Sequence, residues 1–121
     1  MRVVVPLLLA CAISLPICAQ REGNFKIRFE PKVVLQTGVQ VPFEISVSDA
    51  LKQPLTDAQV TLSVETSDQH EQAKTFRAPA VGAGVYVAKP IFPTAGQWDV
   101  LVEVKRADQS SSRMIQFSVK E

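Results

Sequence analysis

The stretch Trp98–Val104, with the sequence WDVLVEV, places large apolar residues at every second position. Its apolar set is Trp98, Val100, Val102 and Val104, and Asp99, Leu101 and Glu103 lie between them. In an α-helix, residues two positions apart point about 200° apart around the axis, so this set would be scattered. In a β-strand the same residues line one face. The stretch therefore predicts a strand with one buried side and one solvent-facing side.

Four more segments show the same alternation. Their apolar positions are Phe25, Ile27 and Phe29; Val39, Val41, Phe43, Ile45 and Val47; Ala58, Val60, Leu62 and Val64; and Ile115, Phe117 and Val119. Two weaker strands are predicted over residues 74–78 and 85–89. The residue types agree with this interpretation, because Val, Ile, Phe and Thr favour half-buried strands. The sequence thus predicts about seven strands after residue 19 and no helix.

Turn signals separate these segments. Asp49–Pro54 follows the second strand, and the polar residues 107–112 are predicted to be the loop of a C-terminal hairpin. Pro42 falls on the outward side of the strand predicted over 39–47, which suggests an edge strand or a bulge there. Strands with one buried face must cover each other in two layers. We therefore predict an all-β, immunoglobulin-like β-sandwich over residues 20–121.

The first nineteen residues, MRVVVPLLLACAISLPICA, are predicted to be a signal peptide that is cleaved after Ala19. Arg2 supplies the positive start, and Val3–Ala19 is an uncharged stretch of seventeen residues. Two alternatives stay open. The stretch could remain as an uncleaved membrane anchor, since about 17–25 apolar residues span a bilayer. Alternatively, Cys11 in Leu-Leu-Ala-Cys could be lipidated. All three interpretations predict an extracytoplasmic domain, either periplasmic or secreted.

Composition excludes several classes of protein. The chain has 13 Lys and Arg against 12 Asp and Glu, a net charge of +1 that is too small for the basic footprint of a nucleic-acid binder. Both cysteines, Cys11 and Cys18, lie in the leader, so the predicted domain has none. It must therefore fold without a disulfide, on its apolar core alone.

The sequence carries little catalytic equipment. The only His, His70, lies in a polar loop without a nucleophile-elbow motif, so a Ser-His-Asp site is not predicted. Asp99 and Glu103 are predicted to lie about 13 Å apart along one strand, too far for a glycosidase pair. Gly82-x-Gly84 is too short for a phosphate loop. We therefore expect no catalytic residues, no bound cofactor and no enzymatic activity.

Two large side chains and one polar cluster need separate interpretation. Trp98 and Tyr86 are predicted to lie in the core, with the Tyr86 hydroxyl bonded to a backbone group at a sheet corner. Asp68-Gln69-His70-Glu71 is the one cluster with metal-ligand atoms, which makes His70 a weak candidate ligand for Cu(II) or Zn(II). Specific sites usually need three or four ligands, so no metal site is predicted with it.

Part of the chain resembles a known family. Gly84-Val-Tyr86 followed by Phe92-x-x-x-Gly96-x-Trp98-x-Val100 is similar to the C-terminal signature of the YtkA-like and FixH-like extracytoplasmic domains. Upstream, the strand ending in Ser48-Asp49 and the element Gln53–Val60 resemble their first half. The resemblance covers about Val39–Val119 and implies a small immunoglobulin-like sandwich.

The resemblance also bears on function. Some relatives are associated with copper supply or metal efflux, and these often carry Met and His in the loop after the Ala-x-Val strand. In this chain that loop offers His70 and no Met.

These observations predict a non-enzymatic accessory or binding module that engages a protein partner in the cell envelope. The alternative is a copper- or heavy-metal-handling protein of the YtkA-like or FixH-like type. No nucleic-acid partner is expected. Contact with a membrane is expected only if the leader is retained or lipidated.

Overall fold

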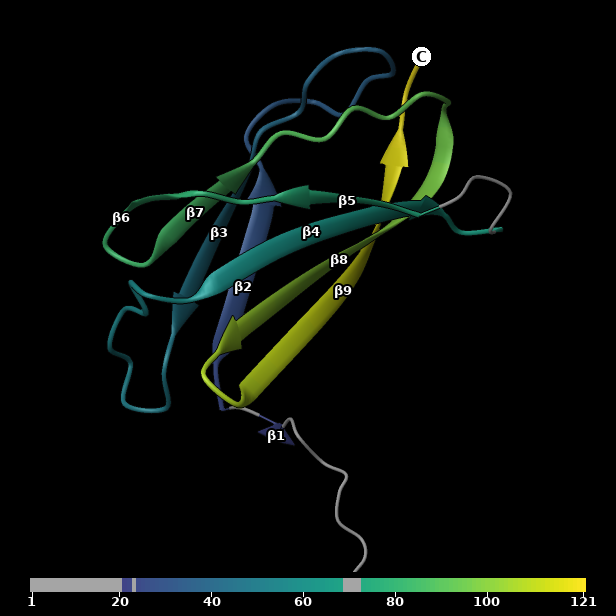
Figure 1. The fold of residues 1–121 in the computed structure, drawn as a ribbon. Coiled ribbons are helices and arrows are strands. Elements are labelled where there is room, and N and C mark those ends of the chain that lie inside the picture. Colours follow the sequence, from purple (N-terminus) through teal and green to yellow (C-terminus); the bar gives the residue numbers. More distant parts are fainter. Residues whose placement is uncertain (1–20, 23, 69–72) are drawn as a thin grey trace, which may run out of the picture.

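The computed structural model describes residues 21–22, 24–68 and 73–121. Within them the chain forms strands and no helix. The strands are β1 (Arg21–Glu22), β2 (Lys26–Pro31), β3 (Phe43–Ser48), β4 (Gln59–Thr66), β5 (Lys74–Arg77), β6 (Ala80–Gly82), β7 (Val85–Ala88), β8 (Gly96–Arg106) and β9 (Gln109–Val119). They form two layers (Figure 1). The predicted all-β class is confirmed, and the seven predicted strands correspond to β2 to β5 and β7 to β9.

The order of the strands is that of an immunoglobulin-like sandwich. One sheet has the antiparallel order β9-β8-β4-β5, and β1 adds two residues in parallel at the β9 edge. The other sheet has the antiparallel order β2-β3-β7-β6. When β2, β3, β4, β6, β7, β8 and β9 are lettered A to G without the extra strand β5, these are the ABED and CFG sheets of the immunoglobulin fold. The sequence pattern predicted the layers but not this order.

The core lies between the two sheets, where the predicted alternation places it. In the pair β4–β8, Val60 faces Val104, and Leu62 faces Val102. All four side chains are buried, as are Phe43 and Ile45 on the facing strand β3. Their neighbours along each strand are more exposed. Burial of apolar surface on alternate positions therefore holds the two layers together.

The strand predicted over residues 39–47 is shorter than expected. β3 begins at Phe43, and Val39 is 47% exposed in the preceding loop. β3 also lies inside its sheet, between β2 and β7, so the prediction of an edge strand or a bulge at Pro42 is wrong. Pro42 precedes the strand, where its missing N–H costs no ladder bond. Its carbonyl accepts a hydrogen bond from the Lys32 N–H at 2.8 Å.

The C-terminal hairpin is longer than expected. Its turn consists of Ala107 and Asp108 alone, and the serines at 110–112 belong to β9. The prediction of a loop over 107–112 is therefore wrong. Backbone pairing with the long strand β8 carries β9 through this polar stretch. The other two strands that were not predicted, β1 and β6, have two and three residues and no apolar alternation to reveal them.

Candidate binding surface

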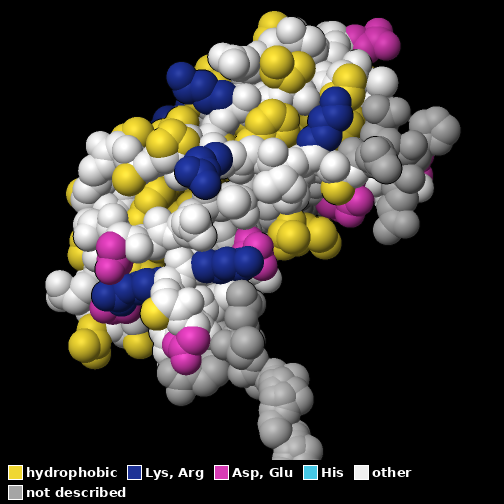
Figure 2. All heavy atoms as spheres, in the orientation of Figure 1, with side chains coloured by type: hydrophobic (Ala, Val, Ile, Leu, Met, Phe, Trp, Pro, Cys, Tyr) yellow, Lys and Arg dark blue, Asp and Glu magenta, His cyan; other side chains and the backbone are white. Residues whose placement is uncertain are grey.

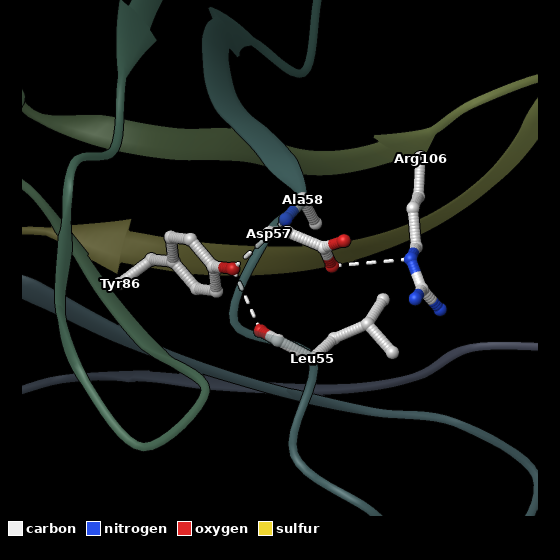
Figure 3. Close-up of polar contacts among 5 residues, drawn as sticks. All are labelled: Leu55, Asp57, Ala58, Tyr86 and Arg106. Atoms are coloured by element: carbon white, nitrogen blue, oxygen red, sulfur yellow. Dashed lines mark hydrogen bonds and ion pairs between the residues drawn. The ribbon is translucent and has the colours of Figure 1, made fainter.

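Trp98 and Tyr86 lie in the core, as predicted. Each is 2% exposed, and the Trp98 Nε1 donates a hydrogen bond to the Thr94 carbonyl at 2.9 Å. The Tyr86 hydroxyl donates to the Leu55 carbonyl at 2.7 Å and accepts from the Ala58 N–H at 3.2 Å (Figure 3). The hydroxyl thus ties the loop before β4 to strand β7, and it is not presented to a ligand.

The carboxylates weighed for catalysis do not form a pair. β8 places Asp99 and Glu103 four residues apart on its outer side. Asp99 accepts a hydrogen bond from the Ser67 hydroxyl at 2.8 Å, and Glu103 lies 4.0 Å from the Lys105 ammonium. Each is therefore engaged by its own polar neighbour on the outer face of the sheet.

The Gly82-x-Gly84 segment and His70 were the two other features that the sequence analysis considered. Gly82 and Gly84 form the tight connection between β6 and β7, with φ of 127° and 75°, and no helix follows them. His70 and its neighbours Gln69 and Glu71 lie outside the described residues. Among the residues that are described, no three His, Cys, Asp or Glu side chains gather as a metal site would require. The candidacy of His70 stays a prediction.

The loop of residues 32–42 is fixed to two other parts of the chain. The Thr37 N–H donates to the Lys120 carbonyl, and the Lys120 N–H donates to the Leu35 carbonyl. The Gly38 N–H donates to the Phe92 carbonyl, and the Val41 N–H donates to the Pro90 carbonyl. These bonds are 2.9–3.0 Å long. The loop therefore has a defined conformation against residues 90–92 and the end of β9.

This fixed loop exposes apolar side chains. Val33, Val34 and Val39 are 51%, 66% and 47% exposed, and Ile91 on the adjoining segment is 42% exposed. We call these four residues the end surface. Figure 2 shows hydrophobic side chains exposed at the end of the molecule where these loops lie. Exposed apolar side chains on a preformed backbone are typical of protein-binding surfaces.

Sequence reasoning missed the end surface for a physical reason. Val39 continues the alternation of Val41 and Phe43, so the pattern assigned it to the buried side of a strand. Strand β3 begins only at Phe43, so Val39 lies in the preceding loop, where its side chain is exposed. The adjacent pair Val33-Val34 fits neither period, and that irregularity was the one signal available.

No helix within the described ranges is long and apolar enough to cross a membrane. A search of curated proteins found no match to the chain. A family model described as YtkA-like matches residues 19–103, a range that includes strands β2 to β7 and most of β8. The match covers more than half of the 121 residues and agrees with the YtkA-like part of the resemblance found in the sequence. The chain therefore belongs to the YtkA-like family.

Proposed function

We propose that this chain is a non-enzymatic, extracytoplasmic binding module that engages a protein of the cell envelope. The leader of residues 1–19 delivers the domain outside the cytoplasm, and the sandwich presents the end surface to its partner. The domain needs no cofactor for this task.

The observation that carries the proposal is the end surface. A flexible loop would lose conformational freedom when it bound, whereas this loop is already fixed by backbone hydrogen bonds to residues 90, 92 and 120. The four side chains of the end surface are Val and Ile, which lose little rotamer entropy on burial. The end surface therefore combines apolar contact area with a preformed shape.

Site-specific photo-crosslinking in the native envelope tests the proposal. A photoreactive residue replaces Val34 in one variant and Met114 in the control, which is 59% exposed on the outer side of β9. We expect one defined crosslinked protein from position 34 and not from position 114. Purified partner should then bind the wild-type domain and bind the Val34→Asp variant at least about tenfold more weakly, because a charge would be desolvated at the contact. Equal crosslinking at both positions, or at neither, would refute the proposal.

A second candidate function is copper handling through the loop between β4 and β5. That loop is the place where the family resemblance expects metal ligands, and it contains Asp68 and His70. Cu(II) titration of the wild-type protein and the His70→Ala variant separates the two functions. Binding that disappears in the variant supports copper handling, and the absence of binding in the wild-type protein excludes it.

A further inference from the structure

A groove opens on the outer face of the sheet β2-β3-β7, at the other end of the sandwich from the end surface. Its volume is about 610 Å³, which lies in the range of ligand-binding pockets. Ser46 and Ser48 of β3 lie at its floor, and Pro54 and Ala83 belong to the connections at one side. We call this site the basic groove.

Four cationic side chains line the basic groove, and no carboxylate does. Lys26 and Arg28 come from β2, Lys52 from the loop after β3, and Arg113 from β9 of the opposite sheet. None of the four forms an ion pair with a carboxylate among the described residues. The chain as a whole is nearly neutral, so this concentration of unpaired positive charge is local. It creates a potential that attracts anions.

Arg113 is held in place at the edge of the sheet. Val47, opposite Ile27, donates its N–H to the Gly84 carbonyl on the far side, so the Ile27 backbone groups point to the free edge of β2. The Arg113 Nη1 donates to the Ile27 carbonyl at 2.8 Å. This bond fixes the guanidinium beside the groove and also blocks the unpaired edge against another strand.

Lys52 projects from a loop with equally defined geometry. The Asp49 Oδ1 accepts hydrogen bonds from the N–H groups of Leu51 and Gln53, each at 2.9 Å. The same loop packs on the β6–β7 connection, because a Cβ on Gly84 would lie only 2.8 Å from the Pro54 Cβ. The wall that carries Lys52 is therefore fixed before any ligand arrives.

The spacing of the charges points to the form of the ligand. Lys26 and Arg28 lie on the same side of β2, with their Cα atoms about 7 Å apart, and their cross-strand partners Ser48 and Ser46 repeat that interval on β3. Alternate side chains of an extended peptide have the same spacing. A single phosphate group would need cations that converge on one point. We propose that the basic groove binds an extended acidic segment of a protein, with carboxylates on alternate residues.

The acidic segment runs along β2, over the outer face of β2 and β3, with one carboxylate near Lys26 and the next near Arg28. Ser46 and Ser48 donate further hydrogen bonds to these carboxylates. At the next position along the ladder, Glu30 faces Glu44, and these two negative charges limit the site at that side. The surface used is different from the end surface, so the proposal does not depend on the partner proposed above.

Binding of a labelled peptide of alternating Glu and Thr residues, measured by fluorescence anisotropy at low ionic strength, tests the proposal. The experiment uses the protein in the form that is recovered from the cells that produce it. The test variant is Lys26→Gln/Arg28→Gln, and the matched control is Lys74→Gln/Arg77→Gln on β5, which removes the same two charges from the other sheet. All four side chains are exposed, so both variants should keep the wild-type circular-dichroism spectrum.

We expect the test variant to bind the peptide about tenfold more weakly and the control variant less than about twofold more weakly. A peptide with Gln in place of Glu should not bind, and added salt should weaken binding. Equal loss in both variants would mean non-specific attraction and would overturn the proposal. The absence of binding to the wild-type protein would do the same, as would preferential binding of inorganic phosphate or of anionic lipid vesicles.

Discussion

The two ends of the sandwich are closed by different chemistry. One end of the sandwich holds residues 32–42, 89–95 and the C-terminus (Figure 1). The core at this end is filled by aromatic rings that contact one another. We call this end the aromatic end. At the other end, which holds residues 49–58 and the β8–β9 turn, the layers are joined by hydrogen bonds of Tyr86 and by an ion pair between Arg106 and Asp57 at 3.1 Å. We call it the tethered end.

The aromatic end depends on contacts between rings. Phe43 contacts the rings of Phe29, Phe92 and Phe117 at centroid distances of 6.3, 6.3 and 5.5 Å. Phe92 in turn meets Trp98 edge-on at 5.3 Å. Such pairs add about 0.5–1.5 kcal/mol each beyond the burial of their area. Stability at this end is therefore spread over residues from β2, β3, β8, β9 and the 89–95 loop.

The largest effect is expected at the centre of this cluster. Phe43→Ala should lower the free energy of unfolding by about 3–5 kcal/mol, because it leaves a cavity among three rings. Small domains have about 5–15 kcal/mol in total, so the variant will be marginal. Urea unfolding followed by the fluorescence of Trp98, the only Trp in the chain, measures the loss.

The exposed substitution Leu51→Ala at the tethered end is the control for this experiment. Leu51 is 79% exposed, and the change should cost less than about 0.5 kcal/mol. Equal losses in the two variants would show that the aromatic cluster does not dominate the stability of the domain.

Much of the fold could be predicted because burial alternates in β3, in β4 and through the middle of β8. Trp98, Val100, Val102 and Val104 are all buried on the inner side of β8, so the period of two is clear in the middle of this strand. The same signal fails in β9, where Ser111 and Arg113 occupy the positions opposite Val104 and Val102. There the backbone ladder, and not the apolar pattern, determines the structure.

A medium effect is expected where the loop after β3 meets the β6–β7 connection. Gly84 has φ of 75°, and an added Cβ would lie 2.8 Å from the Pro54 Cβ and 3.0 Å from the Val47 carbonyl oxygen. Gly84→Ala should therefore cost about 2–4 kcal/mol, the sum of a left-handed backbone and a steric clash. Thermal unfolding monitored by circular dichroism measures the cost.

Gly38→Ala is the matched control at the aromatic end. Gly38 has φ of 77°, but no atom lies within 4 Å of an added Cβ. This variant should cost only the backbone term of about 1–2 kcal/mol. If Gly84→Ala and Gly38→Ala lower the stability by the same amount, the loop that holds Pro54 moves aside at no energetic cost. The wall of the basic groove is then not fixed.

The two proposed binding surfaces could be predicted much less well than the fold. The basic groove combines Lys26, Lys52 and Arg113, which are far apart in the sequence and meet only through the strand order. The period of two predicts which residues face inward, but not which strands are neighbours. The end surface was missed because Val39 and Val41 occupy equivalent positions in the apolar alternation, although Val41 is buried and Val39 is exposed.

The smallest effects are expected at the tethered end, where Figure 3 shows the hydrogen bonds of Tyr86 beside the ion pair of Asp57 and Arg106. Tyr86→Phe should cost about 1–3 kcal/mol, because it leaves the buried Leu55 carbonyl and the partly buried Ala58 N–H without their partner. Asp57→Asn should cost less than about 1 kcal/mol, since the side chains of Arg106 and Asp57 are 45% and 65% exposed and water screens their charges.

Urea unfolding of both variants, with added salt for Asp57→Asn, separates the buried contact from the exposed one. Salt should abolish any difference between Asp57→Asn and the wild-type protein and leave the cost of Tyr86→Phe unchanged, because screening acts on exposed charges and not on a buried neutral hydroxyl. A cost of Tyr86→Phe no larger than that of Asp57→Asn would mean that water replaces the hydroxyl. The tethered end would then be held by the apolar contacts of Leu55, and the two ends of the sandwich would be closed by the same kind of force.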